Sequence, residues 1–336
     1  MHTQSRTAPS RSITSFKALV AALLALAALA GAFGAEAQAA GGPGRIVFVA
    51  GKAERCKGDA CNRFDEVRSI SPHGRGGQRL ALISSVSEIA STERGTLAVV
   101  SRNVAGGGAN SEVFTQIYML TPGGKRTAVF DDRIEGFNPR GLGISGNGRL
   151  LVVAARYEAE TGTGRSKLFV VRPDGSGMRQ LTDGRDNDEM PALSPDGKRV
   201  VFSRTVDGKR NPDLYVVPVS GGEPVQLTDS GLAEINPVWS PDGRRIAFGQ
   251  ANMRANRGTI AVARADGSGV RTLTATGSEW PDPDFSPNGR SLVFVGELPG
   301  RGYDTALYTV RTSGGGRTIA SRAYEYPELA QWTLRP

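Results

Sequence analysis

Residues that commonly carry out catalysis are scarce in this sequence. Its 336 residues include only two histidines and two cysteines. No Gly-x-Ser-x-Gly nucleophile elbow occurs, because the nearest match, Gly143-Ile144-Ser145-Gly146-Asn147, fails at its last position. Phosphate-binding loops, zinc signatures and EF-hand loops are absent from the sequence as well. We therefore expect a protein without a catalytic site.

Long apolar runs are confined to the N-terminus, where residues 18–34 are almost entirely Ala, Leu, Val and Gly. Basic residues precede this run, and Ala37-Gln38-Ala39 follows it as a small-x-small cleavage site. This arrangement predicts that residues 1–39 form a secretory signal peptide, and hence a periplasmic or secreted protein with no stable membrane insertion after cleavage. An uncleaved anchor is the alternative, since the apolar run is just long enough to span a bilayer.

Dense clusters of basic residues are also missing, although the formal net charge is +8. Arginines are scattered through predicted turns, as at Arg199, Arg244 and Arg290, without interleaved aromatic residues. A nucleic-acid-binding surface requires a clustered basic patch. We expect no nucleic-acid partner.

A short phrase recurs along the chain with a fixed period. It reads Ser194-Pro195-Asp196-Gly197, then Ser240-Pro241-Asp242-Gly243, then Ser286-Pro287-Asn288-Gly289, with 46 residues between successive serines. Pro presets φ for a turn, Asp or Asn suits the next position, and Gly accepts the positive φ that follows. Each phrase therefore predicts a tight connection between two antiparallel strands.

A second hairpin falls in each period, as at Pro173-Asp174-Gly175 and Ala265-Asp266-Gly267. Two hairpins make four strands, which is one propeller blade. We therefore predict an all-β fold, a six-bladed β-propeller of four-stranded antiparallel blades, over residues 40–336. The expected blades are 44–84 with 328–335, 87–130, 137–183, 188–229, 234–275 and 280–321.

The two ends of the chain are expected to share one blade. The first strand-like run, Arg45–Val49, matches the strand that follows the Ser-Pro-Asp-Gly turn, and Gln331–Leu334 matches the strand that precedes it. Pairing the C-terminal inner strand with the N-terminal strands would close the ring and remove an exposed edge.

Cys56 and Cys61 lie close together in the expected loop between the first two strands. An even cysteine count in an exported chain predicts a disulfide. A redox or metal-binding role would need different spacing or histidine partners.

A glutamate tends to precede the inner strand of each repeat. Six such acids at one mouth of the central channel would form a ring that could hold calcium through oxygen ligands or receive a basic segment of a partner. Capping of local backbone amides, or simple solvation, is the alternative. The six residues are Glu88, Glu135, Glu189, Glu234, Glu279 and Glu325.

Two further polar features have plainer interpretations. Asp183, Asp186, Asp188 and Glu189 form an acidic cluster that we interpret as a solvated loop rather than a cation site. His73 occupies the place of Asp in a Ser-Pro-His-Gly turn, and we expect a turn residue there.

The repeat as a whole resembles the WD-like (PD40) propeller repeat of the TolB family. The resemblance rests on Leu168-Phe169-Val170, Leu181-Thr182 and Pro191 to Gly197, and it recurs at 214–243 and 260–289. It implies a six-bladed propeller that binds other proteins of the cell envelope. TolB carries an α/β domain before its propeller, whereas only the predicted signal peptide precedes the first strand here, so no partner-binding residues are carried over.

The combined expectation is an exported, monomeric, non-catalytic propeller. Its partner would be an envelope or secreted protein or peptide. The alternative is a propeller that contains calcium and binds or processes a glycan or small molecule. Similar repeats also form the propeller of prolyl-oligopeptidase-type peptidases.

Overall fold

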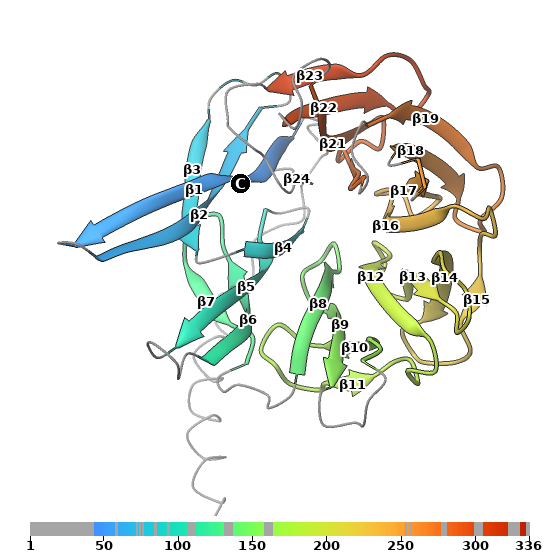
Figure 1. Cartoon of the computed structure of the whole chain (residues 1–336), viewed down its shortest axis with the longest axis horizontal. Coiled ribbons are helices and arrows are strands. Elements are labelled where there is room, and N and C mark those ends of the chain that lie inside the picture. The colour runs from blue at the N-terminus through green and yellow to red at the C-terminus, as the bar shows by residue number, and fades with distance from the viewer. Residues whose placement is uncertain are drawn as a thin grey trace, which may run out of the picture. The chain divides into compact units, whose positions relative to one another are not determined.

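A computed structural model shows 24 strands arranged as six four-stranded antiparallel sheets around a central axis (Figure 1). It describes residues 44–57, 60–71, 73, 75, 77–83, 86–92, 95–105, 112–130, 137–157, 164–252, 254–255, 257–276, 281–298, 305–321 and 330–333. The predicted signal peptide lies outside these residues. No helix capable of crossing a membrane occurs in the described part of the chain.

Each sheet is one blade, and we number the blades from the N-terminus. Figure 1 shows β4, β8, β12 and β16, the first strands of blades 2 to 5, nearest the axis. The strands are, for blade 1, β24 (Ala330–Thr333), β1 (Arg45–Lys57), β2 (Ala60–Ile70) and β3 (Gln78–Ile83); for blade 2, β4 (Val86–Ser91), β5 (Leu97–Ala105), β6 (Glu112–Leu120) and β7 (Arg126–Ala128); for blade 3, β8 (Phe137–Ile144), β9 (Leu151–Tyr157), β10 (Lys167–Val171) and β11 (Arg179–Gln180); for blade 4, β12 (Asn187–Leu193), β13 (Arg199–Thr205), β14 (Asp213–Pro218) and β15 (Val225–Gln226); for blade 5, β16 (Ala233–Trp239), β17 (Arg245–Asn252), β18 (Arg257–Arg264) and β19 (Arg271–Ala275); and for blade 6, β20 (Asp284–Phe285), β21 (Ser291–Glu297), β22 (Thr305–Arg311) and β23 (Thr318–Ser321).

The predicted closure of the ring is confirmed. β24 pairs antiparallel with β1, and Phe48 lies opposite Ala330 in this pairing. Blade 1 therefore takes its inner strand from the C-terminal end and its other three strands from the N-terminal end.

The recurring Ser-Pro turns form as their residue types require. In blade 4 the Ser194 hydroxyl donates to the Asp196 carboxylate at 2.6 Å, and Gly197 has a φ of 67°. The Ser194 amide also donates to the Arg199 carbonyl, which joins β12 to β13. Ser240 and Asp242 repeat the 2.6 Å contact in blade 5.

The hydrophobic core lies between neighbouring blades. One cluster combines Val152 and Leu168 of blade 3 with Val200 and Phe202 of blade 4, all fully buried. Burial of such apolar side chains between the sheets supplies most of the stability of the fold. It also holds the inner strands of adjacent blades in fixed positions around the axis.

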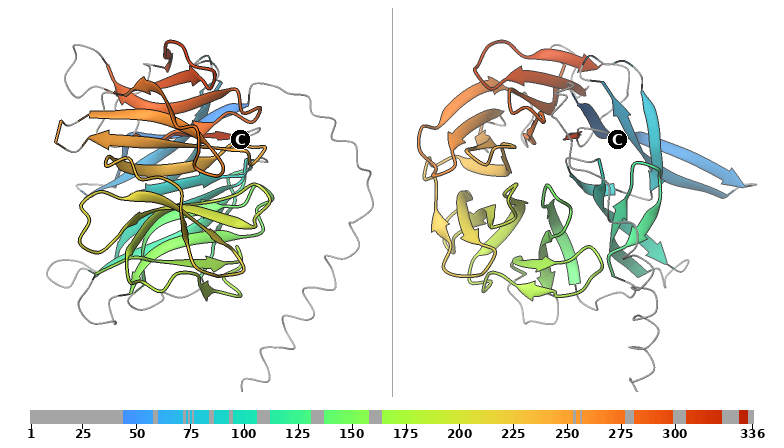
Figure 2. Two further views of the ribbon diagram at one scale, coloured as in Figure 1. Left: turned by 90° about the vertical axis from the view of Figure 1, so that its right-hand side faces the viewer. Right: turned by 180° about the vertical axis from the view of Figure 1, so that it is seen from behind.

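The cysteines lie on strands, not in the loop that the sequence indicated. β1 and β2 extend beyond the rim of the propeller as a long hairpin (Figure 2), and Cys56 lies opposite Cys61 near its tip. Strand pairing continues as far as Lys57 and Ala60, because only residues 58 and 59 separate the two strands. Their side chains lie outside the described part of the structure, so the disulfide remains a prediction.

Candidate functional site

A cavity of about 290 Å³ lies on the propeller axis. Its walls come from the inner strands of blades 2 to 6, including Glu88, Met190 and Asn236. Because residues from five blades line it, the cavity lies in the central channel of the propeller. Because Pro195 and Pro241 of the Ser-Pro turns also line the cavity, it extends toward the mouth where the inner strands end.

Bulges in the inner strands shape this cavity. The register of β12 shifts between Glu189 and Ala192, and that of β16 shifts between Ile235 and Val238. At these bulges Met190 and Asn236 have φ values of 52° and 50°, a conformation that non-glycine residues rarely adopt. Such bulges re-aim side chains, and both residues line the cavity.

In four blades the residue four positions before the turn lines the cavity. Met190 and Asn236 precede Ser194 and Ser240 by four residues, and the same step back from Ser286 leads to Asp282. In blade 2 the turn begins at Thr92, whose amide donates to the Thr96 carbonyl, and four residues earlier is Glu88. All four residues line the cavity, which therefore receives two carboxyl groups from equivalent positions.

Both carboxyl groups favour the protonated form. Burial, with a smaller contribution from the nearby charge of Asp282, raises the pKa of Glu88 to about 8. Burial raises the pKa of Asp282 to about 7. These values cross the physiological range, so the pair can gain or lose a proton when its surroundings change.

Asp284 contributes a third carboxyl group to the cavity lining. Among the described residues that line the cavity there is no Lys, Arg or His. The lining also contains Trp239 and Phe285 and several prolines. The cavity therefore combines apolar walls with acidic groups, which is the composition of a ligand site.

The glutamates singled out in the sequence take different positions. Glu88 lines the cavity, whereas Glu189 and Glu234 are not among its lining residues. Glu189 lies 3.6 Å from the Arg156 guanidinium and accepts a hydrogen bond from Ser166 at 3.4 Å. The other three, Glu135, Glu279 and Glu325, lie outside the described residues.

Glu234 is fully buried on β16. Its Oε1 accepts a hydrogen bond from Gln250 at 3.2 Å, while Oε2 is buried without a hydrogen-bond partner. Its equivalent in blade 4 is Asp188, which stands six residues before the turn serine as Glu234 does. There the partner is Arg204, which donates to both Asp188 oxygens at 2.6 and 2.9 Å.

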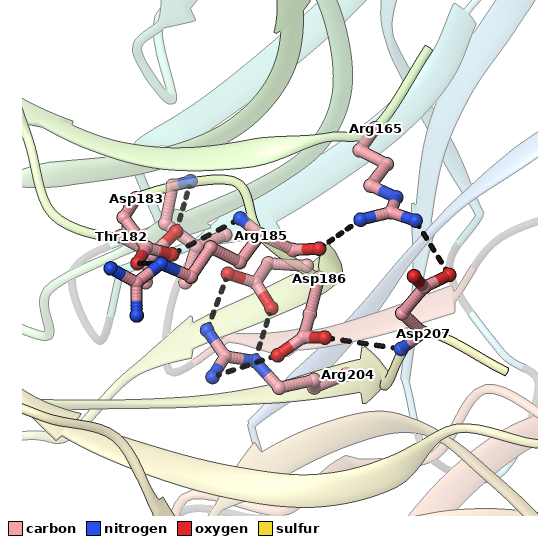
Figure 3. Close-up of polar contacts among 9 residues, drawn as sticks. Arg165, Thr182, Asp183, Arg185, Asp186, Arg204 and Asp207 are labelled. Atoms are coloured by element: carbon pink, nitrogen blue, oxygen red, sulfur yellow. Dashed lines mark hydrogen bonds and ion pairs between the residues drawn. The ribbon is translucent and has the colours of Figure 1, made fainter. Parts of the chain in front are cut away.

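The acidic cluster near Asp183 is paired with arginines (Figure 3), and its Asp183 end is largely exposed to solvent. Asp186 lies 3.5 Å from Arg204, and Arg185 lies 3.0 Å from Asp183. Within the described ranges, no three His, Cys, Asp or Glu side chains are grouped so that they could hold a metal ion. The network therefore joins strands of blade 4 and its neighbouring loops.

Sequence reasoning missed Asp282. The search for glutamates ahead of each inner strand selected Glu279 in that repeat, although the constant four-residue step to the turn identifies Asp282. His73, in contrast, lies exposed in the turn between β2 and β3, as expected.

Three comparisons with known proteins bear on this fold. A family described as "TolB beta propeller domain" (PD40) matches residues 112–327. The crystal structure of TolB from Acinetobacter baumannii superposes with a TM-score of 0.67 at 21% identity, covering 86% of this chain and 66% of that chain. A putative TolB from Agrobacterium tumefaciens gives a TM-score of 0.60 at 20% identity, covering 84% of this chain and 89% of that chain.

A curated enzyme matches a short stretch. Dipeptidyl-peptidase 5 from Porphyromonas gingivalis is 35% identical over 68 residues, which is 20% of this chain. The match spans a tenth of the length of that relative.

Proposed function

The chain belongs to the TolB beta-propeller family, and on this premise we propose that it is an exported, non-catalytic binding module. Its ligand is a segment of another envelope or secreted protein, or a peptide, received in the axial cavity at the Ser-Pro mouth. The observation that carries this proposal is the cavity itself, in which apolar walls surround the carboxyl groups of Glu88, Asp282 and Asp284. The protein acts as a monomer, without a required cofactor.

The absence of a nucleophile–base arrangement favours binding over chemistry. Ser91 and Thr92 line the cavity, but no histidine does among the described residues. Activation of a hydroxyl nucleophile requires an adjacent general base, and the pKa of Glu88, raised to about 8, keeps that carboxyl group largely protonated at neutral pH.

Site-specific cross-linking tests the proposal. A photoreactive amino acid at position 241, at the cavity mouth, is compared with one at exposed position 223, away from the cavity. Recovery of one stoichiometric partner from the native host through position 241 alone supports the proposal. Equal capture through both positions, or no capture through position 241, contradicts it.

A second candidate is an enzyme or metal-containing propeller that binds or processes a glycan or small molecule. The pair of Glu88 and Asp282 supports it, because two carboxyl groups can divide general acid and base roles. Calcium would be held by the same oxygen atoms if the ion were the ligand. A calorimetric calcium titration that gives saturable heat, lost in Asp282→Asn, favours this candidate.

A further inference from the structure

We propose that the axial cavity binds the cationic end of an arginine or lysine side chain between the carboxyl groups of Glu88 and Asp282. This inference rests on the proposed function, since the side chain belongs to the bound polypeptide segment. It names the chemical feature by which the partner is recognised.

The charge of the lining is the first argument. Glu88, Asp282 and Asp284 are its titratable groups, and no basic side chain opposes them among the described lining residues. The titratable side chains of the described lining are therefore all acidic, although the formal net charge of the chain is +8. An acidic cavity of this kind attracts a cation and repels an anion.

The lack of partners is the second argument. Within the part of the chain that the structure describes, neither the Glu88 nor the Asp282 carboxyl group has a hydrogen bond or ion pair, whereas Asp284 is engaged with another group. The contrast with Asp188 is direct, because that buried carboxylate is paired with Arg204. Glu88 and Asp282 are partly exposed to the cavity, and neither has a cationic partner among the described residues, so a ligand can supply the counter-ion that their charged forms require.

The size and walls of the cavity distinguish an organic cation from a metal ion. A volume of about 290 Å³ is at the lower end of that found for organic ligands. No grouping of three acidic, His or Cys side chains suited to a metal is present in the described residues. Pro195, Pro241 and Trp239 instead offer apolar surface along which a methylene stem can pack.

Binding of a cation in this cavity should release protons, which can be measured. Both acids have raised pKa values in the free protein, because burial disfavours their charged forms. A cation between them favours the charged forms, so binding at neutral pH expels protons. The other titratable lining residue is Asp284, and no basic group of the described lining competes with the ligand.

The test compares two acetylated and amidated tripeptides, Gly-Arg-Gly and its citrulline counterpart, which is equal in shape but neutral. Binding is followed by calorimetry in two buffers of different ionisation enthalpy and by tryptophan fluorescence, since Trp239 lines the cavity. We expect the arginine peptide to bind about tenfold more tightly, as charge-assisted hydrogen bonds are stronger than neutral ones, and to release protons.

Variants locate the site. Asp282→Asn and Glu88→Gln should each abolish the preference for arginine over citrulline, whereas the exposed Glu223→Gln, matched in charge change, should keep it. Thermal melting confirms that each variant is folded, which is expected because neutral amides are easier to bury than carboxylates. Equal binding of the two peptides by the unaltered protein, or a preference that survives in both cavity variants, overturns the inference.

The outcome also separates this inference from the proposed function. If cross-linking through position 241 recovers a partner whose capture is unchanged by Asp282→Asn, the binding function holds and the cationic anchor is wrong. If no partner is recovered but arginine is preferred, the proposed function fails while the site's chemistry is confirmed.

Discussion

The guanidinium group of Arg199 lies 4.5 Å from the centre of the Trp239 ring, and these residues belong to different blades. Arg199 begins β13 in blade 4, and Trp239 ends β16 in blade 5. The indole Nε1 donates back to the Ala192 carbonyl of blade 4 at 3.2 Å. Arg245 and Phe285 repeat the stacking across the next interface at 5.5 Å. The residues that flank the Ser-Pro turn therefore join each of these blades to its successor.

Removing this stacking should weaken the interface measurably. Arg199→Ala is expected to lower the free energy of unfolding by about 1 kcal/mol, the value of a partly exposed cation–π contact with its packing. Urea denaturation measures the change. The control is Arg290→Ala, an exposed residue of the equivalent region in blade 6. Equal effects of the two substitutions would show that the stacking contributes nothing.

The buried ion pair of blade 4 should be far more sensitive than its exposed neighbour. Arg204→Met leaves the fully buried Asp188 without its bidentate partner, and we expect a loss of about 3–5 kcal/mol. Arg185→Met breaks the largely exposed contact with Asp183 and should cost less than about 1 kcal/mol. Both are measured by chemical denaturation. A small effect at Arg204 would contradict the assigned role of the pair.

The cavity acids predict a stability that falls as pH rises. Their folded-state pKa values, about 8 for Glu88 and about 7 for Asp282, lie above the ordinary carboxyl range. The folded protein therefore holds protons that the unfolded chain releases, so the stabilisation present below about pH 4.5 is lost as pH rises to 8. We expect a loss on the order of 2 kcal/mol, allowing for solvent in the cavity.

The pH experiment follows urea unfolding at several pH values. Glu88→Gln should flatten the decline and be more stable than the unaltered protein at pH 8, whereas the exposed Glu223→Gln should follow the original curve. A decline that is unchanged in Glu88→Gln would exclude this residue as its source.

Two glycines with nearly the same backbone angle should respond differently to alanine. A Cβ at Gly267 (φ 82°) would come within 2.2 Å of the Leu227 carbonyl oxygen of the preceding blade, whereas a Cβ at Gly208 (φ 80°) meets nothing within 4 Å. Gly208→Ala should cost only the backbone penalty of about 1 kcal/mol. Gly267→Ala should cost about 2 kcal/mol more because of the overlap. Similar losses in denaturation would mean that this close approach between blades does not matter.

The cysteine hairpin offers a local test. Cys56 and Cys61 are paired positions in the register of β1 and β2, and directly opposed strand residues have a Cα separation that a disulfide can span. Mass spectrometry of protein exported to an oxidising compartment should show these residues linked. Replacing both by serine should increase amide exchange in the hairpin and leave the main unfolding transition nearly unchanged. Free thiols in such a preparation would exclude the disulfide.

Blade number and strand order could be predicted because they depend on local turn chemistry, and closure because the terminal strands match complementary positions of the repeat. Ser194, Asp196 and Gly197 specify their turn without help from distant residues. The surroundings of the acids could not be predicted in the same way. Asp188 and Glu234 hold equivalent places, but the residue opposite each, Arg204 or Gln250, decides whether its charge is paired.

The two cavity acids, Glu88 and Asp282, could not both be predicted from the sequence either. Glu88 was identified by residue type, and Asp282 was not, because the search was for glutamates and selected Glu279 in that repeat. Counting back four residues from the first residue of the turn, Thr92 or Ser286, finds both residues. Position within the repeat is therefore a better guide to this channel than residue type.

The pairing of Phe48 with Ala330 has a consequence for how the protein is made. The inner strand of blade 1 lies far along the chain from β1, so the other five blades can be assembled while the ring is still open. Closure over so long a stretch of chain carries a large loop entropy cost and is expected to be a late, slow step. Until then the edge of β1 that pairs with β24 is available to chaperones and to other chains.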